Sequence, residues 1–102
     1  MNKKTIHIPL INFHINYYFD GVKFSKEVLK EYDENMDMAG KVGMCYGNFI
    51  WIKDHKDKST IMHETLHAID NILYDLDSYA SKELRAYMFE YCYNKIEGWF
   101  KK

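Results

Sequence analysis

The chain has 102 residues, of which 47% are hydrophobic and 28% are charged. This length suits one domain with a single modest core, and the composition is typical of a globular protein. The formal net charge of −1 and the isoelectric point near 6.5 argue against a nucleic-acid-binding protein, which would need a basic face. No stretch approaches the roughly 18 apolar residues that span a membrane.

The two cysteines, Cys45 and Cys92, belong to no Cys-x-x-Cys pair, so they indicate neither a disulfide framework nor a cysteine zinc site. We expect two buried thiols in a reducing compartment. The N-terminus is basic, but His7 and Pro9 interrupt the apolar run that a signal peptide requires. These features favour a cytoplasmic protein and carry no signal for an oligomeric state.

The N-terminal region has the two-residue periodicity of β-structure. Apolar residues alternate from Ile6 to Leu10, and a second alternation in the opposite phase runs from Ile11 to Ile15. The change of phase near Pro9 predicts either one strand with a bulge or two short strands.

A helix is predicted over residues 25–36, after a turn signal at residues 19–21. Val28, Leu29 and Tyr32 recur there at helical spacing, and Ser25 is the predicted N-cap. A β-hairpin is predicted next, with strands at Val42–Tyr46 and Phe49–Lys53. Gly47-Asn48 between them suits a two-residue turn with glycine first.

Two helices are predicted to follow. The first covers residues 60–74, is capped by Ser59 or Thr60, and has an apolar stripe of Met62, Leu66, Ile69 and Leu73. The second begins at Ser78 or Ser81, ends at Trp99, and faces inward with Leu84, Met88, Tyr91 and Cys92. This order of elements predicts one α+β domain covering residues 1–102.

The first of these two helices contains the sequence HETLH, with His63, Glu64 and His67. Histidines four residues apart project from one face of a helix and can bind one zinc ion. The glutamate after the first histidine can accept a proton from water that the metal activates. A chain of this composition would contain such a pattern by chance about 2 times in 100. The alternative interpretation is a surface helix with two incidental histidines.

A catalytic zinc ion needs a third protein ligand. The position that metzincins use is Leu73 here, which excludes that class. His55 lies in a predicted polar loop, and His7 and His14 are interpreted as ordinary strand residues.

The last helix offers two glutamates. Glu83 is in line with Ala80, Tyr87 and Tyr91, an apolar row beside the buried stripe, whereas Glu90 lies on a solvated face. Because an unpaired carboxylate beside the core is costly, Glu83 is the predicted third ligand. A surface glutamate is the alternative.

With its downstream ELRAY segment, this motif resembles the gluzincin branch of the zinc metallopeptidases, in a minimal single-domain form. It is also similar to the metallopeptidase domain of phage-repressor-cleaving and related regulator proteins. The similarity covers about residues 42–90 and implies a zincin-like fold, a Zn²⁺ cofactor and peptide-bond hydrolysis. It carries over to His63, Glu64, His67 and Glu83.

One position departs from the larger gluzincins, which have an aspartate four residues after the third ligand to orient a histidine. Tyr87 stands there, and Asp70 is either the substitute or a solvent-facing aspartate. The family also stabilises the oxyanion with a tyrosine or histidine. The candidates, each of which could equally be a packing residue, are Tyr46, Tyr79, Tyr87 and Tyr91.

The resemblance further implies that an exposed edge strand binds an extended peptide by main-chain pairing. The predicted segment is Val42, Gly43, Met44, Cys45 and Tyr46, with Phe49–Lys53 inside the sheet. A peptide or protein substrate is therefore the expected partner, without nucleic acid or membrane. The alternatives are a zinc-stapled binding or regulatory protein without catalysis, and a metal-free interaction module that uses its aromatic surface.

Overall fold

A computed structural model describes residues 3–9, 11–30, 38, 40–74 and 78–101, with side chains in the last helix from Lys82 onward. Strands β1 (Lys3–Ile8), β2 (Phe13–Tyr18), β3 (Gly43–Tyr46) and β4 (Phe49–Ile52) form a mixed sheet in the order β1-β2-β4-β3. The helices are α1 (Gly21–Phe24), its π-helical continuation η1 (Ser25–Leu29), α3 (Lys58–Ile72) and α4 (Ser78–Phe100). The α+β prediction is confirmed.

β1 and β2 form an antiparallel hairpin, which confirms the second of the two predicted arrangements, two short strands. The connecting turn closes with a hydrogen bond from the Asn12 amide to the Pro9 carbonyl at 3.3 Å. Asn12 has a φ of 51°, a left-handed conformation that asparagine tolerates better than most residues. The turn therefore separates the two opposite alternations of the sequence.

The predicted second hairpin is also confirmed. β3 and β4 pair antiparallel through a turn at Gly47-Asn48, and Gly47 has a φ of 57°. β4 pairs with β2 in parallel, so β4 lies inside the sheet and β3 forms one edge, as expected.

The predicted N-caps of the first two helices, Ser25 and then Ser59 or Thr60, are wrong. The Asp20 carboxylate accepts hydrogen bonds from the Val22 and Lys23 amides, so the first helix begins at Gly21, and Ser25 lies inside it. The part of the predicted helix from residue 31 to 36 lies outside the described residues. α3 is capped by Asp57, which accepts from the Thr60 amide at 3.1 Å. Aspartate succeeds at both positions because its carboxylate reaches the free amides of the first turn.

The buried stripe of α3 is rotated relative to the prediction. Ile61, Thr65, Ala68 and Ile69 are buried against the sheet, whereas Met62 and Leu66 are only half-buried. The apolar pattern did not predict that Thr65 is buried. Its hydroxyl group can be buried because it makes two hydrogen bonds. Thr65 donates to the Ile61 carbonyl at 2.7 Å and accepts from the Tyr17 hydroxyl at 2.8 Å.

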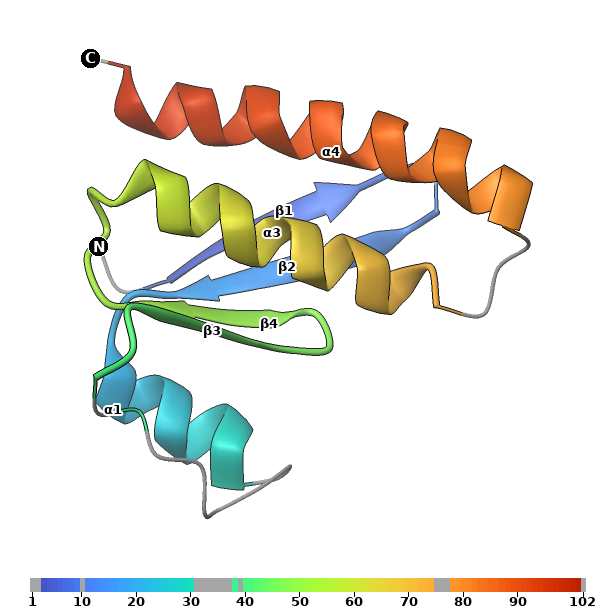
Figure 1. The fold of residues 1–102 in the computed structure, drawn as a ribbon. Coiled ribbons are helices and arrows are strands. Elements are labelled where there is room, and N and C mark those ends of the chain that lie inside the picture. The colour runs from blue at the N-terminus through green and yellow to red at the C-terminus, as the bar shows by residue number, and fades with distance from the viewer. Residues whose placement is uncertain (1–2, 10, 31–37, 39, 75–77, 102) are drawn as a thin grey trace.

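Helices α3 and α4 lie side by side over one face of the sheet (Figure 1). Between them and the strands is the larger core, to which α4 contributes Met88, Cys92 and Ile96. The segment α1–η1 packs on the other face, where a smaller core contains Tyr18, Phe24, Val28, Leu29, Met44 and Trp51. Both cysteines are free thiols. No described helix is long and apolar enough to cross a membrane.

Candidate active site

The three residues of the HETLH motif lie on two adjoining sides of α3. His63 and His67 are exposed, and their Nε2 atoms are 3.1 Å apart, with the rings nearly perpendicular at 83°. In a pair of neutral imidazoles one ring donates its N–H and the other accepts it. The two predicted ligand atoms therefore point toward one another.

This spacing is compatible with a shared metal ion. Two imidazole nitrogens bound at about 2.0–2.1 Å to one tetrahedral zinc ion would lie about 3.3 Å apart. The distance between the His63 and His67 nitrogens is within a few tenths of an ångström of that value. The pair could hold zinc without a change in the backbone of α3.

Glu64 lies beside Gly43 of the edge strand β3, and only 9% of its surface is exposed. A methyl group added at Gly43 would lie 3.1 Å from Glu64 Cγ and 3.4 Å from its Oε2 atom. Burial raises the pKa of the Glu64 carboxyl, and the neighbouring His67 and His63 oppose this shift. The missing side chain at Gly43 is what allows the carboxylate to lie directly against the strand.

β3 and α3 enclose a cavity of about 460 Å³ that contains the motif's carboxylate and second histidine. We call it the α3 groove; its lining is Lys41, Gly43, Met44, Cys45, Tyr46, Glu64, His67 and Asn71. The Asn71 amide donates to the Gly47 carbonyl at 3.1 Å and holds the hairpin turn against α3. The predicted edge-strand segment thus forms one wall of the groove, from Gly43 to Tyr46.

The structure does not bring Glu83 to the histidine pair. Its side chain is exposed on α4, and among the described residues no three His, Cys, Asp or Glu side chains gather closely enough to hold a metal. Arg85 is two residues further along and contacts Asp70 on α3. Positions two apart on a helix point about 160° away from each other, so Glu83 faces away from α3.

The other predicted residues of the site have different surroundings. Asp70 accepts from Arg85 Nε at 2.6 Å and is half exposed, so it pairs with α4. Tyr87 is 40% exposed and stacks with Tyr91 on α4. Of the four oxyanion candidates, Tyr46 lines the α3 groove, and the side chain of Tyr79 lies outside the described residues.

The remaining histidines lie away from the motif. His7 and His14 stack across the first hairpin with ring centroids 4.5 Å apart, and the His7 ring hydrogen-bonds to Asn12. His55 is exposed and packs its ring edge against Phe19. On α4, Glu90 is exposed, as predicted for a solvated face.

Sequence reasoning missed two residues of the groove, Lys41 and Asn71, which are polar residues whose spacing from the motif carries no signal. Gly43 was predicted as part of the edge strand, but its close approach to Glu64 was not. A glycine inside a strand often marks such an approach of another backbone or side chain. No family model, curated protein or solved structure matches this chain.

Proposed function

We propose that this protein is a zinc-dependent metallopeptidase, with His63 and His67 as zinc ligands and Glu64 as the general base. The observation that carries the proposal is the 3.1 Å separation of the two imidazole nitrogens next to a buried carboxylate in an open groove. A closed structural site would instead surround the metal with four protein ligands. Exposed histidines on one helix are poorly suited to that purpose.

When bound, zinc supplies Lewis acidity that activates water and polarises a peptide carbonyl. Glu64 accepts the water proton and later returns it to the leaving amine. A base works best when its pKa approaches the pH of the reaction, and burial beside β3 shifts the pKa of Glu64 in that direction.

The substrate is proposed to be an extended polypeptide that pairs with β3. Among the strands that the structure describes, β3 is at one edge of the sheet, and a sheet edge can pair with an added strand. An added strand would lie in the α3 groove, between β3 and the motif. Its peptide bonds would then pass close to Glu64, which contacts β3 at Gly43.

Glu83 is our proposed third ligand, and it would reach the histidines only if the first turns of α4 rotate toward α3. This rotation would break the Asp70–Arg85 ion pair between α3 and α4, in which both side chains are 48% exposed. Such a pair contributes at most about 1 kcal/mol. Zinc binding to protein sites releases on the order of 10 kcal/mol, which exceeds the cost of breaking this ion pair.

Zinc content and peptide cleavage of three proteins test the proposal: the native chain, Glu64→Gln, and Glu90→Gln as a matched exposed control. We expect one zinc per chain in all three. Cleavage of a mixed peptide pool, followed by mass spectrometry, should fall about 100-fold or more in Glu64→Gln only. Unchanged cleavage in Glu64→Gln, or a native chain that takes up no zinc, would refute the assignment.

The third ligand requires a separate comparison. Glu83→Ala should weaken zinc binding strongly in a competition titration with a chelating dye, while Glu90→Ala should bind zinc like the native chain. Equal affinities for both variants would mean that the third ligand is another group.

A further inference from the structure

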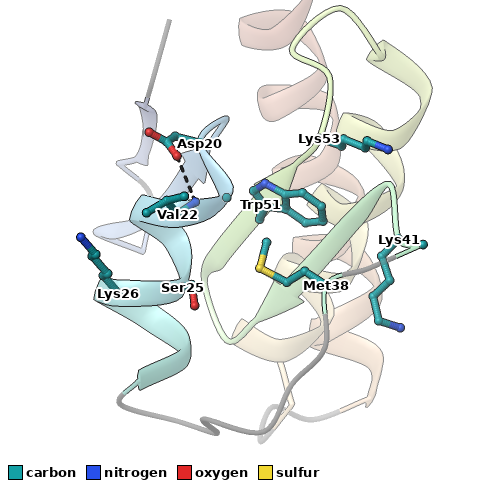
Figure 2. Close-up of a pocket in the computed structure, with 10 residues that line it drawn as sticks. Asp20, Val22, Ser25, Lys26, Met38, Lys41, Trp51 and Lys53 are labelled. Atoms are coloured by element: carbon teal, nitrogen blue, oxygen red, sulfur yellow. Dashed lines mark hydrogen bonds between the residues drawn. The ribbon is translucent and has the colours of Figure 1, made fainter.

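A second cavity lies on the other face of the sheet, between α1 and the segment that leads into β3 (Figure 2). We call it the α1 cavity; its volume is about 660 Å³. Trp51 and Met38 form its apolar wall, and the first turn of α1 forms the opposite wall. Gly21 lets this turn approach closely, because a methyl group there would lie 3.3 Å from both Met38 Cε and Trp51 Nε1.

Among the residues that the structure describes, the lining of the α1 cavity has an excess of positive charge. These residues include Lys26, Lys41 and Lys53 and one carboxylate, Asp20, which caps α1. This local excess contrasts with the formal net charge of −1 of the whole chain. The lysines stand around the apolar wall with their ammonium groups directed outward (Figure 2). An apolar floor with cationic edges favours an apolar side chain flanked by carboxylates.

The α1 cavity and the α3 groove share one lining residue, Lys41. The two lie on opposite faces of β3: Met44 packs into the smaller core beside α1, whereas Cys45 packs against the larger core under α3. A peptide paired with β3 would also direct alternate side chains to these two faces. Beyond Gly43, toward Lys41, the side chains on the α1 face would approach this cavity.

We propose that the α1 cavity is a second binding site for the substrate polypeptide and takes a large apolar side chain from an acidic segment. This inference rests on the proposed function and names the substrate class. Lys41 is two residues from Gly43, the neighbour of Glu64, and an extended chain advances about 3.3 Å per residue. The recognised side chain would therefore be roughly two to four residues from the bond that is cleaved.

Peptide binding tests the second site without requiring turnover. The probe is a fluorescein-labelled peptide of glutamates with one phenylalanine, and its partner has alanine in that place. Fluorescence anisotropy is measured with the Glu64→Gln protein. We expect the phenylalanine peptide to bind about tenfold more tightly, because its ring is buried in the cavity. Equal affinities for the two peptides would overturn the proposal.

Reversing the charge of lysines that line the α1 cavity is a second test of the proposed binding site. Lys26→Glu with Lys53→Glu should weaken binding of the phenylalanine peptide about tenfold or more. The control is Lys30→Glu with Lys56→Glu, which makes the same change in net charge at exposed positions outside the cavity lining. Equal weakening by both double variants would mean that the peptide responds only to overall charge, which would overturn the proposal.

Hydrolysis of the same peptides by the native protein with zinc separates the two inferences. Cleavage that requires the phenylalanine and falls in the Lys26/Lys53 variant is the expected result. Cleavage unchanged in that variant overturns the second site and leaves the proposed function standing. Binding that depends on the phenylalanine without any cleavage overturns the proposed function instead.

Discussion

Gly43→Ala tests the packing of the edge strand against the motif helix. The added methyl group would lie 2.6 Å from Thr60 Cγ2 and 3.1 Å from Glu64 Cγ. The first distance is shorter than any ordinary contact, so Thr60 or the backbone must move. Thr60 cannot turn freely, because its hydroxyl group donates to the Asp57 carboxylate at 2.6 Å.

The expected cost follows from two opposing effects. Overpacking a closely packed site destabilises a protein by about 1–3 kcal/mol. Replacing glycine by alanine stabilises by about 0.4–1 kcal/mol through the unfolded chain. We therefore expect Gly43→Ala to lower the free energy of unfolding by about 1–2 kcal/mol. Urea unfolding followed by circular dichroism at 25 °C measures this difference.

Two further variants make the test specific. Gly98→Ala adds the same methyl group in α4 with no heavy atom within 4 Å, and should raise stability by up to about 1 kcal/mol. Thr60→Ser removes Cγ2 and keeps the capping hydroxyl group, so combining it with Gly43→Ala should restore most of the lost stability. If Gly43→Ala is as stable as the native chain, or Thr60→Ser fails to rescue it, the proposed contact between β3 and α3 is wrong.

Two other predictions concern buried hydroxyl groups. Thr65→Val leaves the Tyr17 hydroxyl buried without its 2.8 Å partner, so it should destabilise by about 1–3 kcal/mol in urea unfolding. Tyr17→Phe combined with it should be less destabilising, and additive losses would contradict the pairing. In a spectroscopic titration at 295 nm, Tyr17 and Tyr18 should ionise last, because burial raises both pKa values, that of Tyr18 to about 12 with help from its hydrogen bond to Glu27. Since the unfolded pKa of Tyr18 is about 10, its contribution to stability is complete below pH 10 and is lost as the pH rises to about 12. Ionisation of all nine tyrosines together near pH 10 in the folded protein would contradict this environment.

Local patterns were sufficient to predict the elements of the fold. The alternations on either side of Pro9, the turn at Gly47-Asn48 and the helical spacing after residue 60 each depend on neighbours within a few residues. The caps were mispredicted by a few residues, because Asp20, Ser25, Asp57 and Thr60 are all competent capping residues. Only the entry direction of the chain decides which one meets the free amides.

Long-range pairing was much less accessible from the sequence. The rotation of the α3 stripe depends on Tyr17, which supplies a hydrogen bond to Thr65 from 48 residues away. Counting apolar residues favours Met62 and Leu66 over a threonine, and no local pattern shows that a partner for the hydroxyl group exists. The same limit applies to Asn71, whose role depends on a carbonyl group 24 residues away in the hairpin turn.

The same distinction between local and long-range determinants applies to the candidate site. His63, Glu64 and His67 are placed by one turn of one helix, so their spacing in the sequence determines their geometry. The choice of a third ligand depends on how α4 is rotated about its axis, and the pattern of α4 does not determine that rotation. Tyr87, Tyr91 and Tyr93 place aromatic rings on more than one side of this helix, with Tyr87 and Tyr93 at least 40% exposed.

The position of Glu64 also depends on tertiary structure. Its side chain lies beside β3 because Gly43 leaves room for it. A larger residue at position 43 would move the carboxylate away from β3, whereas the spacing of His63 and His67 is set by one turn of α3 and would not change. The proposed hydrolysis therefore predicts that Gly43→Ala lowers peptide cleavage and leaves zinc affinity unchanged. An equal loss of both would mean that the methyl group disturbs α3 as a whole.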